Sequence, residues 1–143
     1  MPGWEREVIA FIERVERQGV ERAAYFSFAL DSFAWQARIL ENLVALRSWL
    51  FALPYGDQGI LIRQSHYQRL GGFKSLPLME DVDLVRRIGR TSLRGLRSTA
   101  LTSAKRYEKD GYLSRSLHNL SCLLFYYLGA PADALVARYE KRG

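Results

Sequence analysis

The sequence is poor in cysteine, histidine and proline. Among 143 residues it has one cysteine, Cys122, two histidines and four prolines. A single cysteine cannot form an internal disulfide, and its apolar surroundings are typical of a small buried side chain in the reducing cytoplasm. Cys122, His66 and His118 also lack the paired spacing of zinc ligands. These shortages argue against a disulfide-stabilised secreted protein and against a zinc enzyme.

Long apolar runs and phosphate-binding loops are missing as well. No run of about 18 uncharged apolar residues predicts a transmembrane helix. The first residues, Met-Pro-Gly-Trp-Glu-Arg-Glu, lack the basic and apolar regions of a signal peptide. The glycine-rich GxGxxG and P-loop patterns of nucleotide-binding proteins do not occur. We therefore expect a cytoplasmic protein, with peripheral contact to a membrane left open.

What is present fits one globular domain spanning residues 1–143. Apolar residues make up 48% of the chain and charged residues 25%, which is enough for a core and too apolar for disorder. The net charge of +6 comes mostly from arginines scattered beside glutamates, as on solvated helix faces. A denser basic zone, residues 86–115, could meet nucleotide phosphates, anionic lipid headgroups or only water. Because no recognition motif accompanies the charge, we expect no nucleic-acid partner.

Apolar spacing predicts an α/β fold with about four strands and flanking helices. Spacings of three and four indicate helices, and short branched or aromatic runs indicate strands. The expected helices cover residues 3–18, 33–51, 65–70, 80–90, 112–128 and 132–139. The expected strands cover residues 22–30, 58–63, 93–96 and 100–104. Gly19 is expected to end the first helix, and Asp31-Ser32 to cap the second.

The stretch 54–83 carries the most informative polar residues. Gly56-Asp57-Gln58 precedes the short apolar run 60–62, and Glu80-Asp81 opens a helix. A carboxylate on a rigid helix start facing a cleft suits a general base that deprotonates a hydroxyl. The plain alternative is that Glu80 and Asp81 only cap the helix and interact with its dipole. Asp57 could hydrogen-bond a sugar or an acceptor hydroxyl, or could simply form a turn.

Two further patterns are weaker. Asp81-Val82-Asp83 spells the DxD pattern of metal-dependent nucleotide-sugar enzymes, but inside a helix the two carboxylates point about 200° apart. We therefore expect no metal there. Lys105 and Arg106 follow an expected strand and could neutralise a diphosphate leaving group, or could be ordinary surface charge. Since His66 and His118 have no acidic partner at short range, a nucleophilic hydrolase is the weaker enzyme class.

The stretch from Pro54 to Ile88 resembles the C-terminal half of family 2 glycosyltransferases of the GT-A fold. The most similar subgroup is the bacterial selenium- or radical-SAM-associated transferase 2 type. The shared order is a PYGDQG turn, a strand, a GGF turn, LPLMED and a helix. In the family a TSARRW-like segment follows. This chain has TSAKRY there, with Lys105 and Tyr107 in place of an arginine and the tryptophan. The ending LGAPADALVARYE is also similar, so the resemblance covers nearly the whole chain.

The resemblance implies inverting transfer of a sugar from a nucleotide-diphosphate donor to an acceptor hydroxyl. Asp81, the acid of the LPLMED motif, looks like the general base, and Glu80 is its neighbour. The sequence Gly56-Asp57-Gln58 would line the acceptor side of the cleft. Lys105 and Arg106 would lie near the donor diphosphate.

The donor-binding half and the strand-end DxD motif precede a Pro-Gly-Trp segment in this family, and this chain opens on that segment. We therefore expect a truncated reading frame, a fragment or one piece of a split enzyme, incomplete as this chain alone. It would hold no cofactor, and Mg²⁺ or Mn²⁺ is expected only in a full-length relative. Expected partners are a nucleotide-sugar and a hydroxyl acceptor in a full-length context, a complementary N-terminal half, or a second copy.

A non-catalytic binding module is the rival class. The expected helix 112–128 is rich in apolar and aromatic residues and carries Arg115. Such a helix could dock on a membrane surface or on a partner protein. An ordinary packing helix is the plain alternative for this segment.

Overall fold

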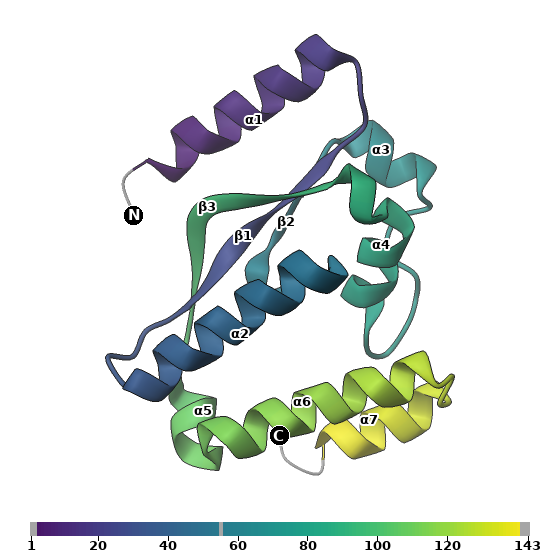
Figure 1. The fold of residues 1–143 in the computed structure, drawn as a ribbon. Coiled ribbons are helices and arrows are strands. Elements are labelled where there is room, and N and C mark those ends of the chain that lie inside the picture. The colour runs from purple at the N-terminus through teal and green to yellow at the C-terminus, as the bar shows by residue number, and fades with distance from the viewer. Residues whose placement is uncertain (1–2, 55, 141–143) are drawn as a thin grey trace.

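The computed structural model describes residues 3–54 and 56–140 (Figure 1). Tyr55 of the PYGDQG motif and Pro2 of the opening segment lie outside the described residues. Within these ranges the helices are α1 (Trp4–Gln18), α2 (Trp35–Phe51), α3 (Gln64–Arg69), α4 (Glu80–Ile88), α5 (Lys105–Asp110), α6 (Tyr112–Tyr127) and α7 (Ala132–Glu140). The strands are β1 (Ala23–Leu30), β2 (Ile60–Ile62) and β3 (Leu93–Thr102), and the 3₁₀ turns are η1 (Gly56–Gln58) and η2 (Arg90–Ser92). The α/β class is confirmed.

The sheet is small and mixed, in the order β2-β1-β3. Strand β1 lies in the centre, antiparallel to β2 and parallel to β3. Helix α1 lies on one side of the sheet, and α2 lies on the other (Figure 1). Helices α5, α6 and α7 gather below α2 in the same view.

The described residues contain three strands in place of the four expected. The two predicted strands 93–96 and 100–104 form the single long strand β3, which pairs with β1 from Ala23↔Leu93 to Leu30↔Thr102. A bulge interrupts the pairing, because three residues of β3 lie between the partners of Tyr25 and Ser27. The Glu7 carboxylate of α1 accepts hydrogen bonds from the bulge N–H groups of Arg97 and Ser98, both at 2.7 Å. Glu7 thus supplies the hydrogen bonds that the bulge N–H groups cannot make to β1, so β3 continues as one strand through the bulge.

Two clusters of buried side chains form the main part of the core, and Val15, the buried residue of α1, belongs to neither. One joins the end of β1 to α2 and contains Phe28, Leu30, Ala37, Leu40, Val44 and Ala104. The other joins the starts of β1 and β3 to α4 and contains Ala23, Leu84, Val85, Ile88 and Leu93. Burial of this second cluster fixes the position of α4 and of the residues at its start.

The start of α2 differs from the prediction. The helix begins at Trp35, and no side chain caps it. Asp31 accepts a hydrogen bond from the Ala104 N–H, which joins the end of β1 to the start of α5. Ser32 accepts from the Ala34 N–H at 3.3 Å. Ser32 Oγ also donates to Glu108 and accepts from the Tyr112 hydroxyl, both at 3.1 Å, so the pair expected to cap α2 joins the end of β1 to α5 and α6.

Helices α2 and α6 are the two longest apolar helices of the fold. Among the described residues, no helix is both long enough and apolar enough to cross a membrane.

Candidate active site

A cavity of about 250 Å³ lies at the start of α4. Its lining combines η1, the loop before α4, and the facing sides of α6 and α7. The residues are Asp57, Leu78, Met79, Glu80, Asp81, Asn119, Cys122 and Tyr139. Three carboxylates that the sequence singled out, on Asp57, Glu80 and Asp81, thus share one cavity although they come from segments 22 or more residues apart along the chain.

The backbone at the start of α4 holds the Asp81 carboxylate. Met79 precedes the helix in the left-handed conformation, with φ of 67°, which is rare for a residue with a side chain. The Val82 N–H donates to Asp81 Oδ1 at 2.8 Å. Val82 and Leu84 are each 1% exposed, so the helix cannot rotate without exposing its apolar face. Asp81 is therefore on a rigid element, as a general base requires.

Asp57 is held by its neighbour Gln58. The Gln58 side chain is 1% exposed, accepts from Ser48 Oγ at 3.1 Å and donates to the Phe26 carbonyl at 3.1 Å. These contacts anchor η1 to α2 and β1. The structure therefore places Gln58 in the core and Asp57 at the cavity. Gly56 belongs to the same 3₁₀ turn.

The electrostatic environment links Asp57 to Asp81. Burial raises the pKa of Asp57, the Asp81 carboxylate raises it further, and the Arg47 guanidinium lowers it. The Asp57 side chain is exposed by its accessible surface, so the pKa is raised by the nearby cavity walls and not by full enclosure. A nearby carboxylate disfavours the charged form of Asp57 and so favours its protonated form.

Polar residues behind the cavity extend this network. Burial raises the pKa of Tyr107, and the Asp57 charge raises it further, while Arg115 and Arg47 lower it. Arg115 is 4% exposed, and its Nη1 lies 3.3 Å from Asp110 Oδ2. Its guanidinium also lies 5.7 Å from the centre of the Tyr139 ring. The negative cavity is thus backed by buried positive charge.

Asn119 contributes a polar atom that sequence reasoning missed. It lines the cavity, and its Oδ1 is buried with no hydrogen-bond partner among the described residues. A buried acceptor without a donor costs free energy, about 1–3 kcal/mol. The signal in the sequence was an asparagine in the middle of a leucine-rich run.

Tyr139 and Met79 were missed because the sequence does not show that the loop before α4 and helix α7 meet here.

Lys105 and Arg106 do not line this cavity. Both are exposed on the first turn of α5. The backbone N–H of Lys105 donates a hydrogen bond to Ser103 Oγ at 3.4 Å. The structure thus keeps these two cations apart from the three carboxylates.

The DxD-like pattern does not assemble a metal site. Asp83 lies 2.7 Å from Arg87 Nη2 and 3.2 Å from Lys74 Nζ, on another side of α4 from the cavity. Burial alone would raise the pKa of Asp83, but hydrogen bonds from Arg87 and Lys74 lower it overall. No group of three or more His, Cys, Asp or Glu side chains suited to a metal occurs in residues 3–54 and 56–140. Asp83 therefore pairs with Arg87 and Lys74 and does not join Asp81 at the cavity.

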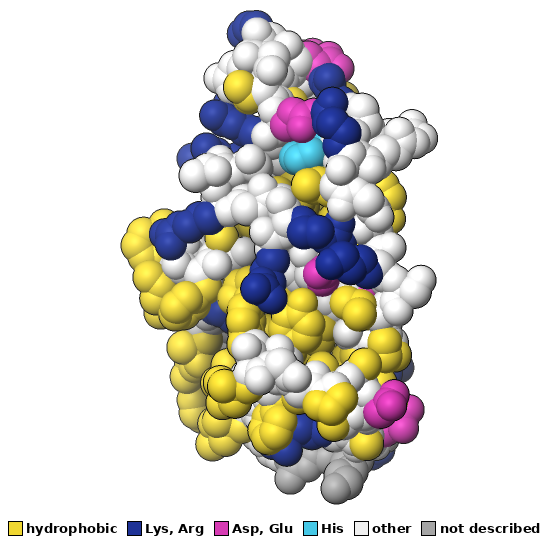
Figure 2. Space-filling model, turned by 90° about the vertical axis from the view of Figure 1, so that its right-hand side faces the viewer, with side chains coloured by type: hydrophobic (Ala, Val, Ile, Leu, Met, Phe, Trp, Pro, Cys, Tyr) yellow, Lys and Arg dark blue, Asp and Glu magenta, His cyan; other side chains and the backbone are white. Residues whose placement is uncertain are grey.

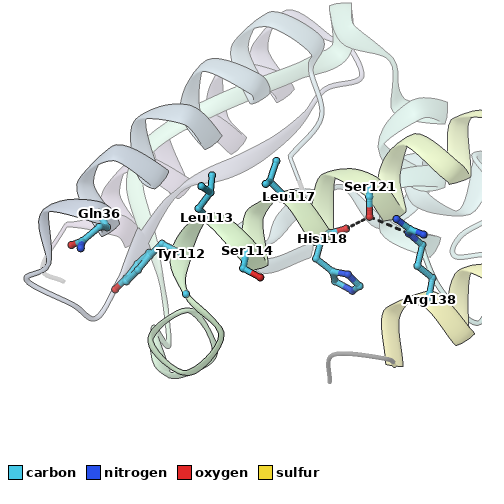
Figure 3. A pocket seen from close by; sticks show the side chains of 9 residues that line it. Gln36, Tyr112, Leu113, Ser114, Leu117, His118, Ser121 and Arg138 are labelled. Carbon is cyan, nitrogen blue, oxygen red and sulfur yellow. Dashed lines mark hydrogen bonds between the residues drawn. The ribbon is translucent and has the colours of Figure 1, made fainter.

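A larger groove of about 1200 Å³ runs along α6 (Figure 3). Its polar residues include Ser114, His118, Ser121 and Arg138. Ser121 Oγ donates to the His118 carbonyl at 2.7 Å and accepts from Arg138 Nε at 3.1 Å. No carboxylate is among the lining residues. The groove therefore lacks the acid that would make His118 a catalytic base, and the smaller cavity is the better candidate.

Comparison with known proteins adds no relative. No protein-family model, curated protein or solved structure matches the chain.

Proposed function

We propose that this chain forms the acceptor side of an inverting family 2 glycosyltransferase with a partial GT-A-like, Rossmann-like fold. The reaction is transfer of a sugar from a nucleotide-diphosphate donor to an acceptor hydroxyl. One observation carries the proposal: Asp57 and Asp81, from the two motifs that resemble the family, line the same cavity. A cytoplasmic location belongs to the same proposal.

In this reaction Asp81 is the general base. Its carboxylate removes the proton of the acceptor hydroxyl as that oxygen bonds to the anomeric carbon and the nucleoside diphosphate leaves. A base in this role needs a fixed position and contact with the hydroxyl, and the packed start of α4 supplies the fixed position. Glu80 and Asp57 accept hydrogen bonds from the acceptor.

Donor binding is the part that this chain does not supply by itself. The sequence has no glycine-rich phosphate loop. We propose that a nucleotide-binding half completes the enzyme, and that Lys105 and Arg106 lie near the donor diphosphate once that half is present. Both side chains are exposed and available for such a contact. The chain alone is then inactive.

Replacing Asp81 by asparagine tests the role of the base. In a complemented, full-length protein, Asp81→Asn should lower the rate of sugar transfer about 10²- to 10⁴-fold, the usual contribution of general-base catalysis. Circular dichroism and thermal unfolding should match the unmodified protein. The measurement is release of nucleoside diphosphate at saturating donor.

Asp83→Asn is the matched control, two residues further along α4. Because Asp83 is held by Arg87 and Lys74 outside the cavity, transfer per folded molecule should stay within about threefold. Loss of transfer in both variants would indicate a metal-binding DxD pair instead. Full transfer by Asp81→Asn would reject the enzyme and favour the non-catalytic binding module.

A further inference from the structure

The outer side of α2 carries a continuous stripe of exposed apolar side chains. Their exposed fractions lie between 42% and 70%, and their spacings of three and four place them along one side of the helix. The members are Trp35, Ile39, Leu43, Leu46, Trp49 and Leu50. A tryptophan stands near each end of the stripe. This side of α2 has no covering element among the described residues.

Helix α6 extends the same surface. Its exposed leucines recur at helical spacing, with exposed fractions of 55% to 75% along the helix and just after it. They are Leu113, Leu117, Leu120, Leu124 and Leu128. A shallow apolar pocket of about 210 Å³ joins the two helices and is lined by Ile39 and Leu43 of α2 and by Leu113 of α6. We name these exposed residues of α2 and α6 the docking face.

The two helices of the docking face present almost no acidic side chains. Helix α6 contains no acidic residue. The one acid of α2, Glu41, turns inward and accepts from the Leu30 N–H at 2.7 Å. At the border, Arg90 donates to the Leu50 carbonyl at 2.9 Å, and the Arg86 guanidinium lies 5.1 Å from the centre of the Tyr127 ring.

Figure 2 shows the same arrangement from the side. Hydrophobic side chains cover much of the lower half and the left edge, and a band of lysine and arginine side chains lies above them. The acidic side chains visible in this view lie at the top, beneath the basic band and at the lower right. An apolar surface thus meets a cationic border.

We propose that the docking face binds peripherally to a membrane surface that contains anionic lipids. Two amphipathic helices lying in the interfacial plane bury their apolar sides among the acyl chains. Tryptophans prefer the headgroup level, and arginines at the border attract anionic headgroups. The net charge of +6 acts in the same direction. The proposal does not depend on sugar transfer.

A second copy of the chain fits the face less well. Two docking faces packed together would offer no carboxylate to Arg86 or Arg90, because α6 has no acidic residue and Glu41 of α2 turns inward. Such an interface would lack charge complementarity. An anionic bilayer offers the opposite sign over the whole surface.

Co-sedimentation with vesicles tests the proposal. The chain should pellet with vesicles of phosphatidylcholine and phosphatidylglycerol and bind far less to phosphatidylcholine alone. The double variant Leu43→Glu/Leu117→Glu should bind at least about tenfold more weakly, because it places charge at the centre of the apolar surface. The matched control is Ile9→Glu on α1, a residue 55% exposed outside the docking face, which should bind like the unmodified chain.

The cationic border predicts a separate effect. Arg86→Gln and Arg90→Gln should each weaken binding about fivefold in dilute salt, with less effect at high ionic strength. In a Trp4→Phe background, Trp35 and Trp49 should shift their emission to shorter wavelength when anionic vesicles are added. This optical signal keeps the test valid if a variant pellets poorly for another reason, and circular dichroism confirms that each variant is folded.

Three results would overturn the proposal. The unmodified chain could stay in the supernatant with anionic vesicles. Leu43→Glu/Leu117→Glu could pellet as well as the unmodified chain. A stable dimer that does not bind vesicles, and that the same two substitutions dissociate, would assign the face to a second copy.

Discussion

Helices α4 and α2 pack against the same strand, β1, but their outer sides differ. Helix α4 turns Val82, Leu84, Val85 and Ile88 into the core, each at most 5% exposed, and its outer side carries paired charge. Helix α2 buries Ala37, Leu40 and Val44 and exposes an apolar stripe on its outer side. Among the described residues, the apolar side chains of α4 are covered, whereas those on the outer side of α2 are exposed. Stability should therefore depend on α4, and association on α2.

The largest expected effect is on stability. Leu84→Ala removes a side chain that is 1% exposed and should lower the free energy of unfolding by about 3 kcal/mol. Leu43→Ala on the outer side of α2, where the side chain is 56% exposed, should change it by less than about 0.5 kcal/mol. Urea unfolding of the two variants gives both values. Equal losses would show that α2 is as tightly packed as α4.

A smaller effect concerns the charges on the outer side of α4. Asp83→Asn should cost about 1.5 kcal/mol, the scale of hydrogen bonds to a charged group. Because the folded pKa of Asp83 is lowered, its contribution is complete above the ordinary value of 3.8 and disappears as pH falls through the lowered value. Unfolding measured against pH should show the variant and the unmodified chain converging in acid. A constant difference at all pH values would contradict the ion pair.

The smallest effect lies at the end of α2. Ala52 follows the helix in the left-handed conformation with φ of 51°. Ala52→Gly should raise the free energy of unfolding by about 0.5 kcal/mol, because glycine adopts this conformation without strain. Thermal unfolding would detect the change. A loss of stability would mean that α2 does not end in this conformation.

Local signals in the sequence predicted much of the fold. The helix expected over residues 3–18 ends at Gly19, which has φ of 61°, and the helix expected at Glu80 begins there. Both follow from apolar spacing and from end signals that lie within a few residues. Strand β3 could not be predicted as one element, because the Glu7 carboxylate that closes its bulge comes from about 90 residues earlier.

In the candidate site, too, local patterns predicted some residues, and long-range packing determined the others. The resemblance to a known family singled out Asp57 and Asp81, and the structure brings them to one cavity. Asn119 and Tyr139 reach that cavity only through the packing of α6 and α7, which no local pattern describes. Gln58 looked like a cleft residue, but Ser48 and the Phe26 carbonyl supply the partners that let its amide be buried.

The pairing of β1 with β3 has a consequence for synthesis of the chain. Ala23 pairs with Leu93, and Leu30 pairs with Thr102, so the central strand lacks its main partner until about 70 further residues have been made. At about 5–20 residues per second, that delay is roughly 4 to 14 s on the ribosome. During this interval β1 and α2 can already pack against each other, but the edge of β1 that pairs with β3 stays open. An open strand edge beside an exposed apolar helix favours pairing with other chains until β3 has been made.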